Sequence, residues 1–138
     1  MSLATWILGE LRTVMPQEPI FDGPRSAYTF DGVAVAASVQ RCVVVHVVSP
    51  SHESVTVEPT ADLARARAIV HTFATTRAEM EARQGKIARA LKNRTPADER
   101  YEWSLFEHPE SRQVDPDPSV PGAPFHAIDV FHVAGFEK

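Results

Sequence analysis

The residues best suited to chemistry are a histidine and an aspartate that each stand inside an apolar segment. His46 lies in the run CVVVHVVS (residues 42–49), and Asp129 lies between Ile128 and Val130 near the C-terminus. Desolvation in such surroundings raises the pKa of a carboxyl group, and a histidine there can bind a ligand or move a proton. His46 and Asp129 are therefore the candidate catalytic residues.

Both residues also have a simpler structural interpretation. His46 fits a neutral core histidine that is hydrogen-bonded to a backbone carbonyl or a nearby hydroxyl group. Asp129 fits an edge-strand carboxylate that reaches water or pairs with an arginine, since charges on edge strands discourage aggregation. The sequence leaves these alternatives open.

Aromatic and histidine side chains near the C-terminus are the candidate ligand-binding residues. Tyr101 and Trp103 share one face of the segment YEWSL, and His126 and His132 share one face of the last predicted strand. The two histidines are six residues apart, about 20 Å along a strand, which is too far for both to bind one metal ion. We therefore predict no metal site, and no motif indicates a cofactor.

Composition and charge exclude several classes of protein. The 138 residues, 43% of them hydrophobic, suit a single domain over residues 1–138. A formal net charge of -4 argues against nucleic acid as the main partner. The single cysteine, the absence of a signal-peptide pattern and the lack of an apolar run of about 18 residues predict a cytoplasmic protein without a membrane span. The frequent Ala, Arg, Val and Pro are typical of a bacterial or phage gene.

The elements that would position the candidate residues follow from hydrophobic periodicity. Residues 3–15 predict an amphipathic helix behind Ser2 as N-cap. A four-strand antiparallel meander follows, with segments at 26–30, 33–39, 42–49 and 55–58 and a hairpin turn at Asp31-Gly32.

The second half of the chain changes from helical to strand patterns. Residues 60–92 read as two helices, 60–74 and 76–92, broken at a capping box that begins with Thr76, or as one rod about 50 Å long. Strands are expected at 101–108 and 125–136. The five prolines of residues 109–124 predict a long loop that is either functional or disordered.

These elements predict an α+β fold, in which an antiparallel sheet carries helices packed on one face. The strand at 42–48 is apolar on both faces, so its second face requires a cover, either another subunit or a cavity. The favoured function is a non-catalytic oligomeric binding or assembly module, most simply a homodimer, with the 109–124 loop as a contact arm. The alternative is a small pocket enzyme or ligand-binding protein that uses Asp129 and His46 on an apolar small molecule.

Overall fold

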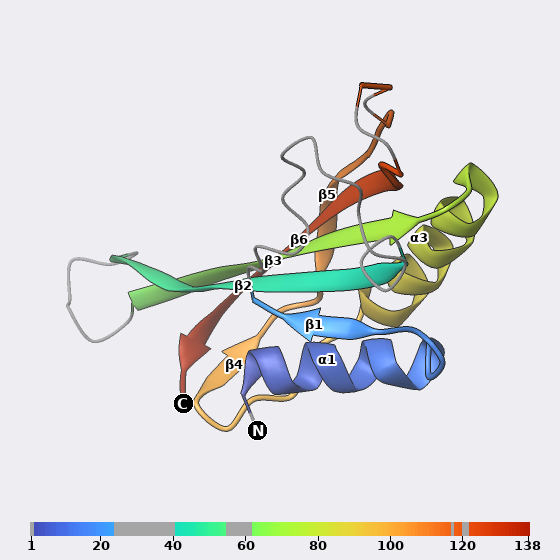
Figure 1. The fold of residues 1–138 in the computed structure, drawn as a ribbon. Coiled ribbons are helices and arrows are strands. Elements are labelled where there is room, and N and C mark those ends of the chain that lie inside the picture. The colour runs from blue at the N-terminus through green and yellow to red at the C-terminus, as the bar shows by residue number, and fades with distance from the viewer. Residues whose placement is uncertain (1, 24–40, 55–61, 117, 120–121) are drawn as a thin grey trace.

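The structure is a computed structural model that describes residues 2–23, 41–54, 62–116, 118–119 and 122–138. Six strands form one curled sheet in the order β1-β2-β3-β6-β4, and β5 also pairs with β6 (Figure 1). β4 and β5 follow each other along β6, β4 beside residues 135–137 and β5 beside residues 126–132. The strands are β1 Ile20–Asp22, β2 Cys42–Ser54, β3 Asp62–Ala74, β4 Tyr101–Trp103, β5 Glu107–Val114 and β6 Phe125–Glu137.

The sheet is mixed, so the prediction of a purely antiparallel sheet with a four-strand meander is wrong. β1 runs parallel to β2, with Ile20 beside Val43, whereas β2, β3 and β6 are antiparallel neighbours. Residues 49–54 continue β2 instead of turning, with a register irregularity between Val48 and Ser51. The predicted turn at Asp31-Gly32 and the predicted strand at 55–58 lie outside the described residues.

Residues 62–74 form the strand β3, not the first of the two predicted helices. Ala64, Ala66, Ala68 and Val70 are buried on one face and alternate with side chains that point to the other. Alanine and arginine favour helices, but β3 lies in the middle of the sheet, where both of its edges are hydrogen-bonded. Tertiary pairing therefore overrides the local propensity.

Residues 107–114 form the strand β5. This strand includes the first part of the segment 109–124, for which the sequence predicted a loop. Pro109 falls at a register irregularity between Glu107 and Glu110, a place where a strand tolerates proline. The side chains of β5 are mostly exposed and polar, which suits an edge strand. Residues 115–124 then connect β5 to β6.

Two helices, α1 (Leu3–Val14) and α3 (Arg77–Leu91), are present in the described part of the chain. Ser2 and Thr76 are their N-caps, and each side chain accepts a hydrogen bond from the backbone N–H three residues on. α3 begins at the predicted break, which excludes one rod from 60 to 92. Neither helix of the described residues is long and apolar enough to cross a membrane.

Both helices pack on the same face of the sheet, here called the first face. This packing forms one large core, in which the side chains of α1 and α3 meet alternate residues of β2, β3 and β6. The core includes Trp6, Ile7 and Leu11 of α1, Ile87 and Leu91 of α3, Val43 and Val45 of β2, and Phe131 and Val133 of β6. The helices therefore cover the first face.

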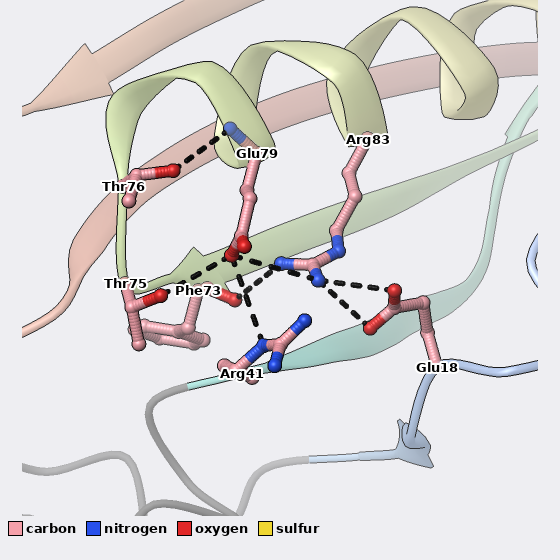
Figure 2. Close-up of polar contacts among 7 residues, drawn as sticks. All are labelled: Glu18, Arg41, Phe73, Thr75, Thr76, Glu79 and Arg83. Atoms are coloured by element: carbon pink, nitrogen blue, oxygen red, sulfur yellow. Dashed lines mark hydrogen bonds and ion pairs between the residues drawn. The ribbon is translucent and has the colours of Figure 1, made fainter.

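A buried arginine joins α3 to the rest of the fold (Figure 2). The guanidinium of Arg83 donates hydrogen bonds to the Phe73 carbonyl at 3.3 Å and to the Glu18 carboxylate at 3.0 Å, and its side chain is 6% exposed. Glu79 lies 4.0 Å from Arg83 and 3.7 Å from Arg41. Because a buried charge is stable only when it is paired, this cluster fixes α3 to the end of β3 and to the segment after α1.

Candidate functional site

The face of the sheet that turns away from α1 and α3, here called the second face, gathers basic side chains. On β3, Arg65, Arg67 and His71 alternate with the buried alanines, and on β6, His126 and His132 point the same way. Since neighbouring residues of a strand point to opposite faces, the register alone creates this cluster. The guanidinium groups of Arg65 and Arg67 are thus placed on the same face as three histidine rings.

Two adjoining hollows on the second face share Arg67 and His132 and together form a groove, here called the Arg67–His132 groove. Their volumes are about 480 and 430 Å³. Ile69 and Val130 provide apolar lining, whereas Arg67, His132 and Glu107 are exposed. Within the described ranges, the side chains of Arg67 and His132 make no hydrogen bond or ion pair. The Arg67 guanidinium and the His132 ring are therefore available to a polar group from outside.

His71 and His126 form a hydrogen-bonded pair of rings beside the groove. Nδ1 of His71 lies 2.9 Å from Nε2 of His126, and the His126 ring also stacks on Phe73 with centroids 4.4 Å apart. Burial, followed by the charges of His71 and Arg112, lowers the pKa of His126 to about 4. Burial, followed by the charges of His46 and Arg112, also lowers the pKa of His71. Both rings are therefore neutral at neutral pH, and one donates its N–H to the other.

His46 and Asp129, the two candidate catalytic residues, lie on opposite faces of the sheet. His46 aligns with Ile69 and Val130 and is half-buried on the second face. Asp129 aligns with Val70 on the first face. The structure therefore does not bring the two residues into one site.

Asp129 is instead held in a buried polar cluster beneath α3. One carboxylate oxygen lies 2.9 Å from Nε2 of His108, and the other accepts a hydrogen bond from the side-chain amide of Gln84 at 3.1 Å. The His108 ring stacks on Phe131 with centroids 4.3 Å apart. Neither Asp129 nor His108 lines the groove. This geometry suits a structural carboxylate better than a group that meets a substrate.

The candidate ligand-binding residues are also divided between the faces. Tyr101 and Trp103 are buried in the first-face core with ring centroids 4.8 Å apart, and Trp103 donates its indole N–H to Asp98. They line a separate hollow of about 440 Å³ near the C-terminus. His126 and His132 are on the second face, as their spacing predicts, but only His132 lines the groove.

Sequence reasoning missed the arginines of the second face. Arg65 and Arg67 alternate with alanines, which is a period of two, but the predicted helix scattered them around a cylinder. Reading residues 62–74 as a strand would have placed both arginines on one face, and the pairing of β3 with β6 sets them beside Ala134 and His132. Across the described residues, no group of three or more His, Cys, Asp or Glu side chains is placed to hold a metal ion.

Comparison with known proteins yields a fold and no family. No protein-family model and no curated protein sequence matches the chain. Among solved structures, it is similar to a chain in "Virion of native gene transfer agent (GTA) particle", with a TM-score of 0.61 and 12% sequence identity. The similarity covers 99% of this chain and 96% of the other. At this identity, the two chains share the fold.

Proposed function

We propose that the chain is a non-catalytic subunit of a virion-like particle and that it binds other protein chains through the second face of its sheet. The observation that carries this proposal is the Arg67–His132 groove, where the exposed side chains of Arg67 and His132, with no partner in the described ranges, stand beside apolar side chains. Protein interfaces combine apolar contact with charges that select the partner. The groove therefore has the chemistry of a contact surface.

The structural similarity to a chain of a virion supports the proposal that the assembly is a virion-like particle. The two chains match over nearly their whole lengths, so the shared fold is not a small motif inside a larger protein. Fold alone does not determine function, and the groove supplies the physical reason for assembly. The competing enzyme function would need Asp129 and His46 in one site, and they lie on opposite faces.

The test is to purify particles from the strain that carries the gene and to separate them on a density gradient. An antibody against the chain should detect it in the fractions that contain the particle proteins, at a constant ratio to them across the peak. A soluble cytoplasmic enzyme of the same strain serves as the control for trapped protein. If the chain stays with that enzyme at the top of the gradient, the proposal fails.

A further inference from the structure

β5 is an edge strand, and alternate residues of it turn their backbone groups away from the sheet. Among the described residues, β5 pairs with β6 alone (Figure 1). The backbone of Ala134 in β6 faces the side of β4 and β5, because its carbonyl accepts a hydrogen bond from the N–H of Ser104 at 2.7 Å. Backbone direction alternates along a strand, and β6 pairs with β3 without irregularity, so every even-numbered residue of β6 faces this side.

Ser111 and Gln113 therefore carry open hydrogen-bonding groups. Glu110 and Arg112 lie opposite even-numbered residues of β6 and exchange hydrogen bonds with them, so Ser111 and Gln113 direct their N–H and C=O groups outward. The structure gives these outward groups no partner among the described residues. Such a row of open backbone groups can accept another strand.

The charges of β5 match a second copy of the same strand in an antiparallel register centred on Ser111. Glu110 and Arg112 both point to the second face, and their side chains are 49% and 58% exposed. A two-fold axis at Ser111 sets Glu110 of each copy opposite Arg112 of the other. These residues form the wide pairs of the new ladder, in which the side chains of the two strands come closest.

The neighbouring registers lack this match. A two-fold axis at Glu110 or at Arg112 would set that residue against its own copy and bring like charges together, which is destabilising. An axis at Gln113 would bring no opposite charges together. The charge pattern of β5 therefore selects the register at Ser111.

We propose that β5 pairs with β5 of a second copy of this chain, antiparallel and with the two-fold axis at Ser111, so that two sheets join into one. The pairing runs from Pro109 to Gln113 of each copy. The N–H of Gln113 donates to the carbonyl of Pro109, and the N–H that proline lacks leaves one bond unmade on each side. The contact uses the open edge of β5 in both copies, so it closes at a dimer. This inference goes beyond the proposed function, because it assigns a partner to the edge of the sheet and not to its second face.

A crosslink tests the register. Ser111→Cys places a thiol on the two-fold axis, beside its own copy at a Cα separation of about 5.5 Å. A short bis-maleimide should therefore convert most of this variant into a covalent dimer. Gln113→Cys is the matched control and should crosslink weakly, because its two copies lie four residues apart along the paired strands, roughly 14 Å. The wild type should give no covalent dimer, since its only cysteine, Cys42, is buried.

The native mass tests the charge pairs, by light scattering on a sizing column at low and high micromolar concentrations. The wild type should reach the mass of two chains at the higher concentration. Glu110→Arg and Arg112→Glu should each give the mass of one chain, because each sets like charges opposite each other twice. The variant with both charges exchanged should recover the dimer. Arg89→Glu, an exposed charge reversal on α3, is the matched control and should keep the wild-type mass.

A proline tests the backbone contact in the same measurement. Ser111→Pro removes an N–H that points outward, so it should abolish the dimer while β5 stays paired with β6. Ser111→Ala removes the hydroxyl group and keeps the N–H, and it should remain a dimer. Circular dichroism and thermal melting check that each variant folds. If Ser111→Pro does not fold, the two charge reversals still decide, because both lie at exposed side chains.

Several outcomes would overturn the inference. One is a wild type that is monomeric at both concentrations, and another is a dimer that survives Ser111→Pro and both single charge reversals. Equal crosslinking of Ser111→Cys and Gln113→Cys would rule out the register. A dimer broken by Arg67→Glu but not by Ser111→Pro would place the contact on the second face. A monomer that travels with particles on the gradient would leave the proposed function standing and refute this inference alone, whereas a dimer that stays at the top of the gradient would do the reverse.

Discussion

Asp129 and His108 form a buried pair between the sheet and α3, with 2.9 Å between the carboxylate Oδ1 and the ring Nε2. The side chains are 1% and 11% exposed. Glu107 aligns with His132 on the second face, so strand alternation turns His108 to the first face, where its ring stacks on Phe131 and reaches Asp129. The acid in the apolar row of β6 thus has a fixed partner.

Replacing Asp129 by alanine should lower the free energy of unfolding by about 2–3 kcal/mol, because His108 and Gln84 would lose their acceptor in a buried place. Urea denaturation measures the change. Asp115→Ala, at a side chain 83% exposed, is the control and should stay within about 0.5 kcal/mol of the wild type. Unchanged or increased stability in Asp129→Ala would mean that the buried carboxylate destabilises the fold. Asp129 would then again be a candidate for a catalytic acid or base.

Arg83→Met should lower the free energy of unfolding by about 3 kcal/mol or more, because it removes the buried cation that pairs with the Glu18 carboxylate and donates a hydrogen bond to the Phe73 carbonyl. A double-mutant cycle with Glu18→Gln isolates the coupling between the two charges. Arg100→Met is the matched control, since its pair with Glu137 is 68% and 55% exposed and should be worth less than about 1 kcal/mol. Equal losses at both sites would contradict the structural role of Arg83.

Sequence patterns predict a helix or strand correctly where the hydrophobic period agrees with the capping residues. The prediction fails where a helical period and a strand period occur in the same segment. Residues 3–15 and 76–92 each combine an N-cap with apolar spacing, and α1 and α3 begin at the capped positions. In residues 62–74, Leu63, Ala66, Val70 and Phe73 fit a helix as well as the alternating alanines fit a strand. Only the pairing of β3 with β2 and β6, distant in the chain, decides between them.

The candidate site is harder to predict than the elements, because it depends on which strands are neighbours. The opposite orientations of Asp129 and His132 follow from strand alternation alone. That Arg67 lies beside His132 depends on the pairing of β3 with β6, and that His108 reaches Asp129 depends on the pairing of β5 with β6. Neither feature has a local signal in the sequence.

Stability should fall as the pH drops from about 6.5 toward 4, because the folded state holds His126 neutral while the unfolded chain takes up the proton. The pKa of His126 is lowered from 6.5 to about 4. The neutral ring therefore contributes its full stabilisation above pH 6.5, and this stabilisation is lost as the pH falls to about 4. Urea denaturation at half-unit pH steps measures the slope. His126→Gln should flatten the profile, whereas His132→Gln, at an exposed ring, should keep it. If the stability of His126→Gln falls with pH as steeply as that of the wild type, His126 is not the group responsible for the pH dependence.

Gly135→Ala should destabilise the protein by about 1–3 kcal/mol and loosen β4, because a Cβ at this position has no room. It would overlap the carbonyl group of Glu102 and lie 2.9 Å from Cα of Trp103, both in the neighbouring strand. Thermal melting gives the loss, and a red shift of tryptophan fluorescence would report exposure of the buried Trp103 ring.

Gly85→Ala is the matched control for that substitution, since the nearest atom to its Cβ is the far end of the flexible Arg89 side chain at 3.5 Å. Within α3, alanine should raise stability by about 0.5–1 kcal/mol, because glycine is a poor helix former. The two substitutions add the same methyl group, so opposite signs would show that β4 pairs closely with β6. Stabilisation in both variants would mean that β4 can shift away from β6 at no cost, and that Tyr101 and Trp103 are not fixed in the core.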